Sequence, residues 1–256
     1  MKGVWLETLT WPEAKARIDA GAPVIIPIGA VSKEHGHHLP LNTDFLTARE
    51  LANRVAAELA VIIAPIICFG YYPAFVRYPG SLHLSAETFK SLLTETFAKF
   101  HRDGATRIAV INTGVSTEPV LRVAVRDFFE ATGVRVRTAD VRLLGRRTRG
   151  LMAQKLGGHG DEAETSVMLA IAPDAVRMEK AIEDYGNGDR QPASCFYAPT
   201  VFDGDSGSGP DFSATGVRGD PTLASAEKGR AILADMADEL IAGLRAEFPE
   251  PFRSCS

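Results

Sequence analysis

The stretch GAVSKEHGHHLPLNTD, residues 29–44, holds three of the six histidines of the chain. An apolar run, Val24 to Ile28, precedes it and is typical of a buried strand. A helical pattern follows it, with one apolar face formed by Ala48, Leu51, Val55 and Leu59. The stretch is therefore predicted to be the loop between the carboxyl end of a strand and the next helix. Ligands and catalytic groups gather at that edge of an open α/β sheet.

The same stretch carries the donor atoms of a metal site. Imidazole nitrogens together with carboxylate oxygens bind Zn, Mn and Fe, and here Glu34 and Asp44 flank the histidines. A simpler interpretation also remains open, in which His35 and His38 fill a turn and Asp44 caps the helix that follows. Three histidines between two acids within sixteen residues favour the metal site.

Further along the chain, strand and helix patterns alternate. Strands are predicted at residues 61–67, 107–111 and 134–138, and helices at residues 11–20, 85–100, around Leu121 to Phe128, 164–171 and 223–248. This order predicts an α/β fold, a three-layer αβα single domain over residues 1–256 with a mostly parallel central sheet. Right-handed crossovers then bring the loops after the strands to one edge, where distant segments share a site.

Two segments do not fit the strand–helix alternation. Residues 142–158 are basic and rich in glycine, which predicts a solvated connection or a subunit contact. Residues 184–221 are rich in Gly, Ser, Asp and Pro, and an irregular segment of that length predicts a lid or an oligomer arm.

Composition excludes several classes of protein. The formal net charge of −4 offers no basic field for nucleic acid or acidic lipid. The first residues lack the apolar core of a signal peptide, and the longest apolar run, residues 61–70, is too short to span a membrane. Three cysteines without a close pair exclude a disulfide framework. We therefore expect a cytoplasmic protein without nucleic-acid or membrane partners.

Four segments together resemble the creatininase (creatinine amidohydrolase) family. Residues 36–44, GHHLPLNTD, resemble its metal-binding signature, and residues 78–81, YPGS, its Pro-Gly turn. Residues 159–166, HGDEAETS, resemble its His-Ala-Gly-x-x-Glu-Thr-Ser motif, and residues 215–224, TGVRGDPTLA, its late Gly-Asp-Pro-Thr motif. The resemblance implies a hydrolase that binds one or two divalent metal ions (Zn, Mn or Fe) and forms a homo-oligomer, a hexamer in this family.

Two positions depart from the family pattern. Lys33 stands where the family has a metal-binding Glu, and Glu34, one position later, is the candidate replacement. Gly114 stands where the family has a histidine ligand of one metal. Either the second metal is lost, or His83 or His37 supplies the missing nitrogen.

The predicted site draws on all these segments. The predicted metal ligands are Glu34, His35, Asp44 and Glu164. His159, five residues before Glu164, is predicted to move a proton to the leaving nitrogen, so His159 and Glu164 are the predicted catalytic residues. The predicted substrate-binding residues are Thr113, Ser116 and Tyr72.

The function predicted from the sequence is that of a metal-dependent amidohydrolase. It would cleave a carbon–nitrogen bond of a small amide, expected to be cyclic, with metal-activated water. Two alternatives remain at this point. In the first, the scaffold has lost its metal centre and binds a small molecule or acts in assembly. In the second, one metal ion supports a lyase or isomerase reaction.

Overall fold

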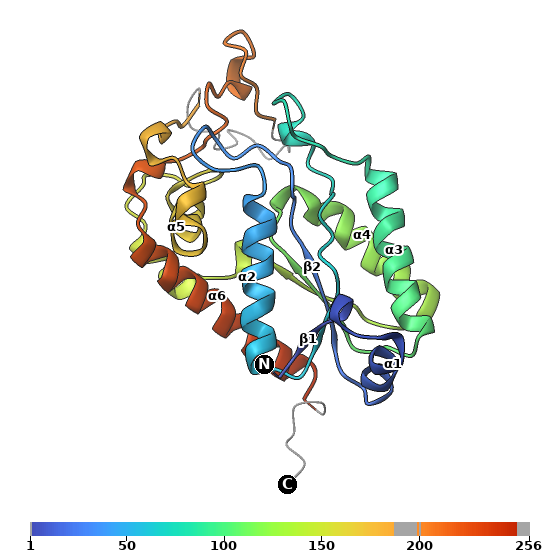
Figure 1. The fold of residues 1–256 in the computed structure, drawn as a ribbon. Coiled ribbons are helices and arrows are strands. Elements are labelled where there is room, and N and C mark those ends of the chain that lie inside the picture. Colours follow the sequence, from blue (N-terminus) through green and yellow to red (C-terminus); the bar gives the residue numbers. More distant parts are fainter. Residues whose placement is uncertain (1, 187–198, 200, 250–256) are drawn as a thin grey trace.

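The computed structural model describes residues 2–186, 199 and 201–249. Its centre is a five-stranded, all-parallel sheet in the order β1-β3-β2-β4-β5, with helices on both faces (Figure 1). The strands are β1 (Val4–Trp5), β2 (Val24–Ile28), β3 (Ile62–Ile63), β4 (Ile108–Asn112) and β5 (Arg137–Asp140). The α/β class and the parallel sheet predicted from the alternation of strands and helices are confirmed.

Two helical layers enclose the sheet and form two separate apolar cores. The layer of α1 (Trp11–Asp19), α3 (Ala86–Arg102) and α4 (Glu118–Thr132) packs on one face through residues such as Phe89, Phe97 and Leu121. The layer of α2 (Thr43–Glu58), α5 (Glu162–Ile171) and α6 (Ala226–Glu247) packs on the other through residues such as Leu51, Val167 and Leu233.

The central strands β2 and β4 position the site. Every residue of both strands is buried, as expected for parallel strands covered on both faces. They pair in register from Val24 with Ile108 to Ile28 with Asn112. Both strands therefore end at the same edge of the sheet, and the loops that start at Gly29 and Thr113 leave it side by side.

The structure corrects three details of the predicted sheet. The strand predicted at 61–67 is only Ile62–Ile63 with an isolated bridge at Ile67, because Pro65 has no N–H to donate to a ladder. The last strand starts at Arg137 rather than at residue 134. Val134 and Val136, which precede it, pack into the apolar core without pairing to a strand. Strand β1 at the sheet edge is not predicted, because a strand of two residues is too short to show a periodicity in the sequence.

The basic segment 142–158 lies against α6 through ion pairs. Arg147 pairs with Asp238 at 2.9 Å and also with buried Asp235, and Arg146 pairs with Glu239 at 3.0 Å. The connection is therefore fixed to the protein by its charges, although the arginines stay exposed. Part of the predicted lid or arm, residues 187–198 and 200, lies outside the described residues. No helix in the described part of the chain is long and apolar enough to cross a membrane.

Candidate functional site

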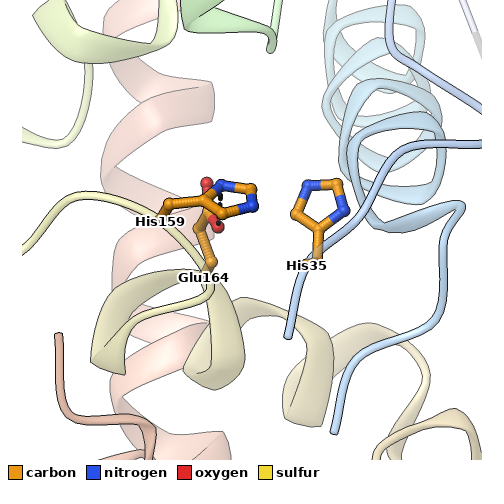
Figure 2. Close-up of side chains that lie close together, drawn as sticks. All are labelled: His35, His159 and Glu164. Carbon is orange, nitrogen blue, oxygen red and sulfur yellow. Dashed lines mark ion pairs between the residues drawn. The ribbon is translucent and has the colours of Figure 1, made fainter. Parts of the chain in front are cut away.

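Three side chains converge at the edge where the strands end (Figure 2). His35, His159 and Glu164 each offer a ligand atom, and these atoms lie within 4.8 Å of one another. His35 comes from the loop after β2, His159 from the glycine-rich loop before α5, and Glu164 from the first turn of α5. The two imidazole rings are 4.9 Å apart between centroids.

His35 is fully buried between two acceptor groups. Its Nδ1 donates a hydrogen bond to the carbonyl oxygen of Lys33 at 2.9 Å, which fixes the tautomer. Its Nε2 lies 3.1 Å from Oδ1 of Asp44. A neutral ring in this tautomer has no proton for that second contact, whereas a divalent cation there satisfies both the nitrogen and the carboxylate. A carbonyl on the other ring nitrogen is also how metal-binding histidines are usually oriented.

Asp44, in the first turn of α2, has a different partner on each oxygen. Oδ2 lies 2.6 Å from Nζ of Lys33, an ion pair without hydrogen-bond geometry, and both side chains are buried. Burial alone would raise the pKa of Asp44, but the charge of Lys33 and the contact with His35 outweigh it and hold the pKa far below its usual value. The Lys33 ammonium also lies 5.1 Å from the centroid of the Phe75 ring.

His159 is buried and held from several sides. Its Nε2 donates to Oε2 of Glu34 at 3.0 Å and to the Glu34 carbonyl at 2.8 Å, while Nδ1 lies 3.8 Å from Oε2 of Glu164. Burial would lower the pKa of His159, but the Glu34 carboxylate outweighs it and raises the pKa. Backbone hydrogen bonds in both directions tie His159 to Arg218, and Phe75 covers its ring at 4.1 Å between centroids.

Glu34 is buried and faces His159 rather than His35. Its Oε1 accepts a hydrogen bond from the backbone N–H of Gly36. Gly216 has φ +79°, and a Cβ there would lie 2.1 Å from the same oxygen, so only glycine fits this position. Burial would raise the pKa of Glu34, but His159 outweighs it and lowers the pKa. The motif at 215–224 thus helps to build the site.

Glu164 has both a structural and a site role. Asp161 caps α5 by accepting from the backbone N–H groups of Ala163 and Glu164. Oε2 of Glu164 accepts from the N–H of Gly160 at 2.7 Å, as an acid at a helix start often does. The Glu164 side chain remains 36% exposed and borders a pocket that Asp44 also lines.

Comparisons with known proteins place this arrangement in a family. The family model described as "Creatininase: Creatinine amidohydrolase" matches residues 7–244. The chain belongs to the creatininase family. It is 26% identical to creatinine amidohydrolase from Pseudomonas putida, covering 97% of this chain and 98% of the relative. It is 27% identical to 3-dehydro-scyllo-inosose hydrolase from Thermotoga maritima, with coverage of 96% and 85%.

A third relative is the mycofactocin precursor peptide peptidase of Mycobacterium tuberculosis, 30% identical over 89% of this chain and 86% of the relative. Among solved structures, a mutant creatininase superposes with a TM-score of 0.80 at 24% identity, covering 96% of this chain and 99% of that one. A second mutant creatininase, described as a Zn–Zn type, gives 0.78 at 25% identity, with coverage of 97% and 100%. The named relatives are hydrolases, and the fold is that of creatininase.

The three predicted substrate-binding residues lie nearby, but two hydroxyls already have structural partners. Thr113 donates to the carbonyls of Ile28 and Asp44, at 3.0 Å each. Tyr72 donates to the carbonyl of Ser32 at 3.0 Å and also to that of Leu82, and burial raises the pKa of Tyr72 to about 12. Ser116 borders a void of about 10 Å³ shared with Lys33, Asp44 and Gly114.

The histidines considered as substitutes at Gly114 do not reach the cluster. His83 is exposed, with its ring centroid 6.3 Å from that of Tyr71. His37 is also exposed, and neither belongs to the group of possible metal ligands found among the described residues. The sequence did not identify Phe75 as the ring over His159 and Lys33, although the aromatic composition of residues 69–78 was a usable signal.

Proposed function

We propose that this member of the creatininase family is a hydrolase that cleaves a carbon–nitrogen bond of a small amide with one divalent ion. His35, Asp44 and Glu164 would bind the ion, which would be Zn, Mn or Fe. The observation that supports this most directly is the convergence of His35, His159 and Glu164, with Oδ1 of Asp44 3.1 Å from the free nitrogen of His35.

The charges of the site favour one ion rather than two. The carboxylates of Glu34, Asp44 and Glu164 carry three negative charges, and the buried ammonium of Lys33 compensates one of them. One divalent ion neutralises the remaining two when His159 is neutral, and when His159 is protonated a second ion would add to an excess of positive charge. Lys33 also occupies Oδ2 of Asp44, so that carboxylate has one oxygen left for a metal.

An ion bound there would acidify a water molecule toward a pKa of about 7 and polarise the amide carbonyl. The chain's own residues would do the rest. Glu34 would keep the imidazole of His159 oriented through Nε2, and Nδ1 of His159 would hold the proton for the leaving nitrogen. Phe75 excludes water from one face of that ring.

The relatives support this reaction class. Two of them are named as an amidohydrolase and a peptidase, and both names refer to breaking carbon–nitrogen bonds. One creatininase structure is described as a manganese form, one as a zinc–zinc form, and another as a complex with creatine. We still expect a cytoplasmic protein that forms a homo-oligomer. Sedimentation of the purified protein would test the oligomeric state.

The Lys33–Asp44 ion pair also supports a second candidate function. In a scaffold without a metal ion, the buried ammonium of Lys33 would compensate the negative charge of Asp44 in place of the metal. In that case the protein would bind a small amide without hydrolysing it.

Metal analysis by mass spectrometry on protein purified without chelators separates the two. We expect about one tightly bound divalent ion per chain, and its loss together with hydrolysis in His35→Ala. His37→Ala is the control, because that neighbouring histidine is exposed and should change neither. Metal-free, folded wild-type protein would rule out the hydrolase and favour the binding protein. Full metal content in an active His35→Ala variant would show that the ion binds elsewhere.

A further inference from the structure

A pocket of about 180 Å³ opens next to the candidate site, on the side of Asp44 and Glu164. It is lined by residues of α2, α5 and α6 and by the segment that follows β5. Most of its wall is apolar, formed by Val141, Leu144, Met152, Val167, Ile232 and Met236. The rest of its lining includes Asp44 and Glu164 of the candidate site, together with Thr43, Thr47, Thr113, Thr148 and Arg149.

The wall contributed by residues 141–152 is held in place before any ligand arrives. Buried Asp235 on α6 accepts from the backbone N–H groups of Arg147 at 2.8 Å and Thr148 at 3.1 Å. Glu239, one turn further along the same helix, accepts from the N–H of Gly145 at 2.8 Å. A pocket with fixed walls discriminates between ligands by shape and polarity, since it does not adapt to them.

The apolar wall restricts what can enter. A hydroxyl group moved from water to such a wall loses its hydrogen bonds without replacement, which disfavours polyhydroxylated rings. An apolar group gains from leaving water. A dry cavity of roughly 150 Å³ is enough to hold benzene, so this pocket has room for a phenyl ring or a branched aliphatic chain.

We infer that the substrate is an amide with an apolar substituent, aromatic or branched aliphatic, which fills this pocket while its carbonyl faces Asp44 and Glu164. The inference rests on the proposed function for the reaction, but the apolar wall of the pocket is formed by residues that are not proposed to bind the metal. Arg149, exposed at the pocket wall, is available to an anionic end of a longer substrate.

Two neighbouring leucines allow a matched test. Leu144 lines the pocket, whereas Leu143 beside it is 63% exposed and does not. Leu144→Trp should fill the pocket, and Leu143→Trp should leave it open. Binding of benzamide and of acetamide is measured by calorimetry on the metal-loaded protein and again after metal removal.

We expect benzamide to bind roughly tenfold to a hundredfold more tightly than acetamide, in the wild type and in Leu143→Trp alike. Leu144→Trp should abolish this preference. Val141→Phe, which fills the pocket from the same segment, replaces that variant if it does not fold. Equal affinities for the two amides, or a preference that survives in both filled variants, would overturn the inference.

The outcomes also separate this inference from the proposed function. If the wild type binds benzamide selectively but contains no metal and hydrolyses no amide, the hydrolase proposal fails and the apolar pocket stands. If metal and hydrolysis are present but acetamide and benzamide are equivalent in binding, the pocket inference fails alone.

Discussion

Nζ of Lys33 lies 2.6 Å from Oδ2 of Asp44, and both side chains are at least nine-tenths buried. Removing one partner of a buried pair costs roughly 3–5 kcal/mol because the other charge stays buried without compensation. We therefore expect Lys33→Met to lower the free energy of unfolding by about that amount when metal is absent. A divalent ion should restore much of the loss, since it supplies positive charge to the same carboxylate.

Urea unfolding with and without a chelator measures both effects. Lys2→Met is the control, because Lys2 forms an exposed ion pair with Glu58 at 3.6 Å and should contribute at most about 1 kcal/mol. If metal-free Lys33→Met is as stable as this control, the ammonium does not compensate Asp44.

His159→Gln should separate metal binding from proton transfer. If His159 carries the proton to the leaving nitrogen, kcat falls by roughly 10²–10⁴ while the metal content stays at its wild-type value. The assignment depends on Nε2 being used by Glu34 and on Nδ1 standing 3.8 Å from Glu164. A variant that loses its metal together with its activity would make His159 a ligand instead.

The sequence predicts that His35, Asp44 and Glu164 lie at one edge of the sheet, because each follows from a local pattern. Loops after parallel strands share one edge, and an acid in the first turn of a helix stays at the end of that helix. In the structure the ligand atoms of His35 and Glu164 lie within 4.8 Å of each other, and Asp44 lies 3.1 Å from His35. That the three share one ion stays a prediction. Lys33, at the position where the family has a metal-binding Glu, forms an ion pair with the carboxylate of Asp44.

The pairing of Glu34 with His159 was not predictable, because 125 positions separate the two residues. Neighbouring side chains in an extended segment point in different directions, and in the structure Glu34 faces His159 although the sequence predicts Glu34 and His35 as ligands of one ion. The direction of Glu34 depends on Gly216, whose missing Cβ leaves room for the carboxylate. The engaged hydroxyls of Thr113 and Tyr72 likewise depend on carbonyls from distant segments.

His38 predicts how stability depends on pH. Its Nε2 contacts Oγ1 of Thr165 at 2.8 Å, its Nδ1 has no partner among the described residues, and burial lowers the pKa of His38 to about 4. In the unfolded chain the pKa is about 6.5, so the unfolded state binds the proton first as pH falls. Stability is therefore complete above about pH 6.5 and declines toward pH 4, by about 1.4 kcal/mol per pH unit.

The comparison of wild type with His38→Gln isolates this effect. Between pH 6.5 and 5 the wild type should lose roughly 1.5 kcal/mol more of its unfolding free energy than the variant, because glutamine does not titrate. All other titrating groups are common to both proteins and cancel in the difference. Parallel curves of unfolding free energy against pH for the two proteins would show that the pKa of His38 is not lowered in the folded protein.

Two glycines of α6 test whether helix packing places Glu164. At Gly229 a Cβ would lie 1.8 Å from the backbone carbonyl oxygen of Ser166 on α5, and at Gly243 nothing lies within 4 Å. Gly229→Ala must push α5 away from α6, which as overpacking costs roughly 1–3 kcal/mol of stability. Because α5 carries Glu164 in its first turn, hydrolysis should fall as well, by up to about 100-fold for a shift near 1 Å.

Gly243→Ala should instead stabilise the helix by about 0.5–1 kcal/mol and leave hydrolysis unchanged. Urea unfolding and kinetics on both variants measure the contrast, and a Gly229→Ala protein as stable and active as Gly243→Ala would contradict this packing of α5 on α6.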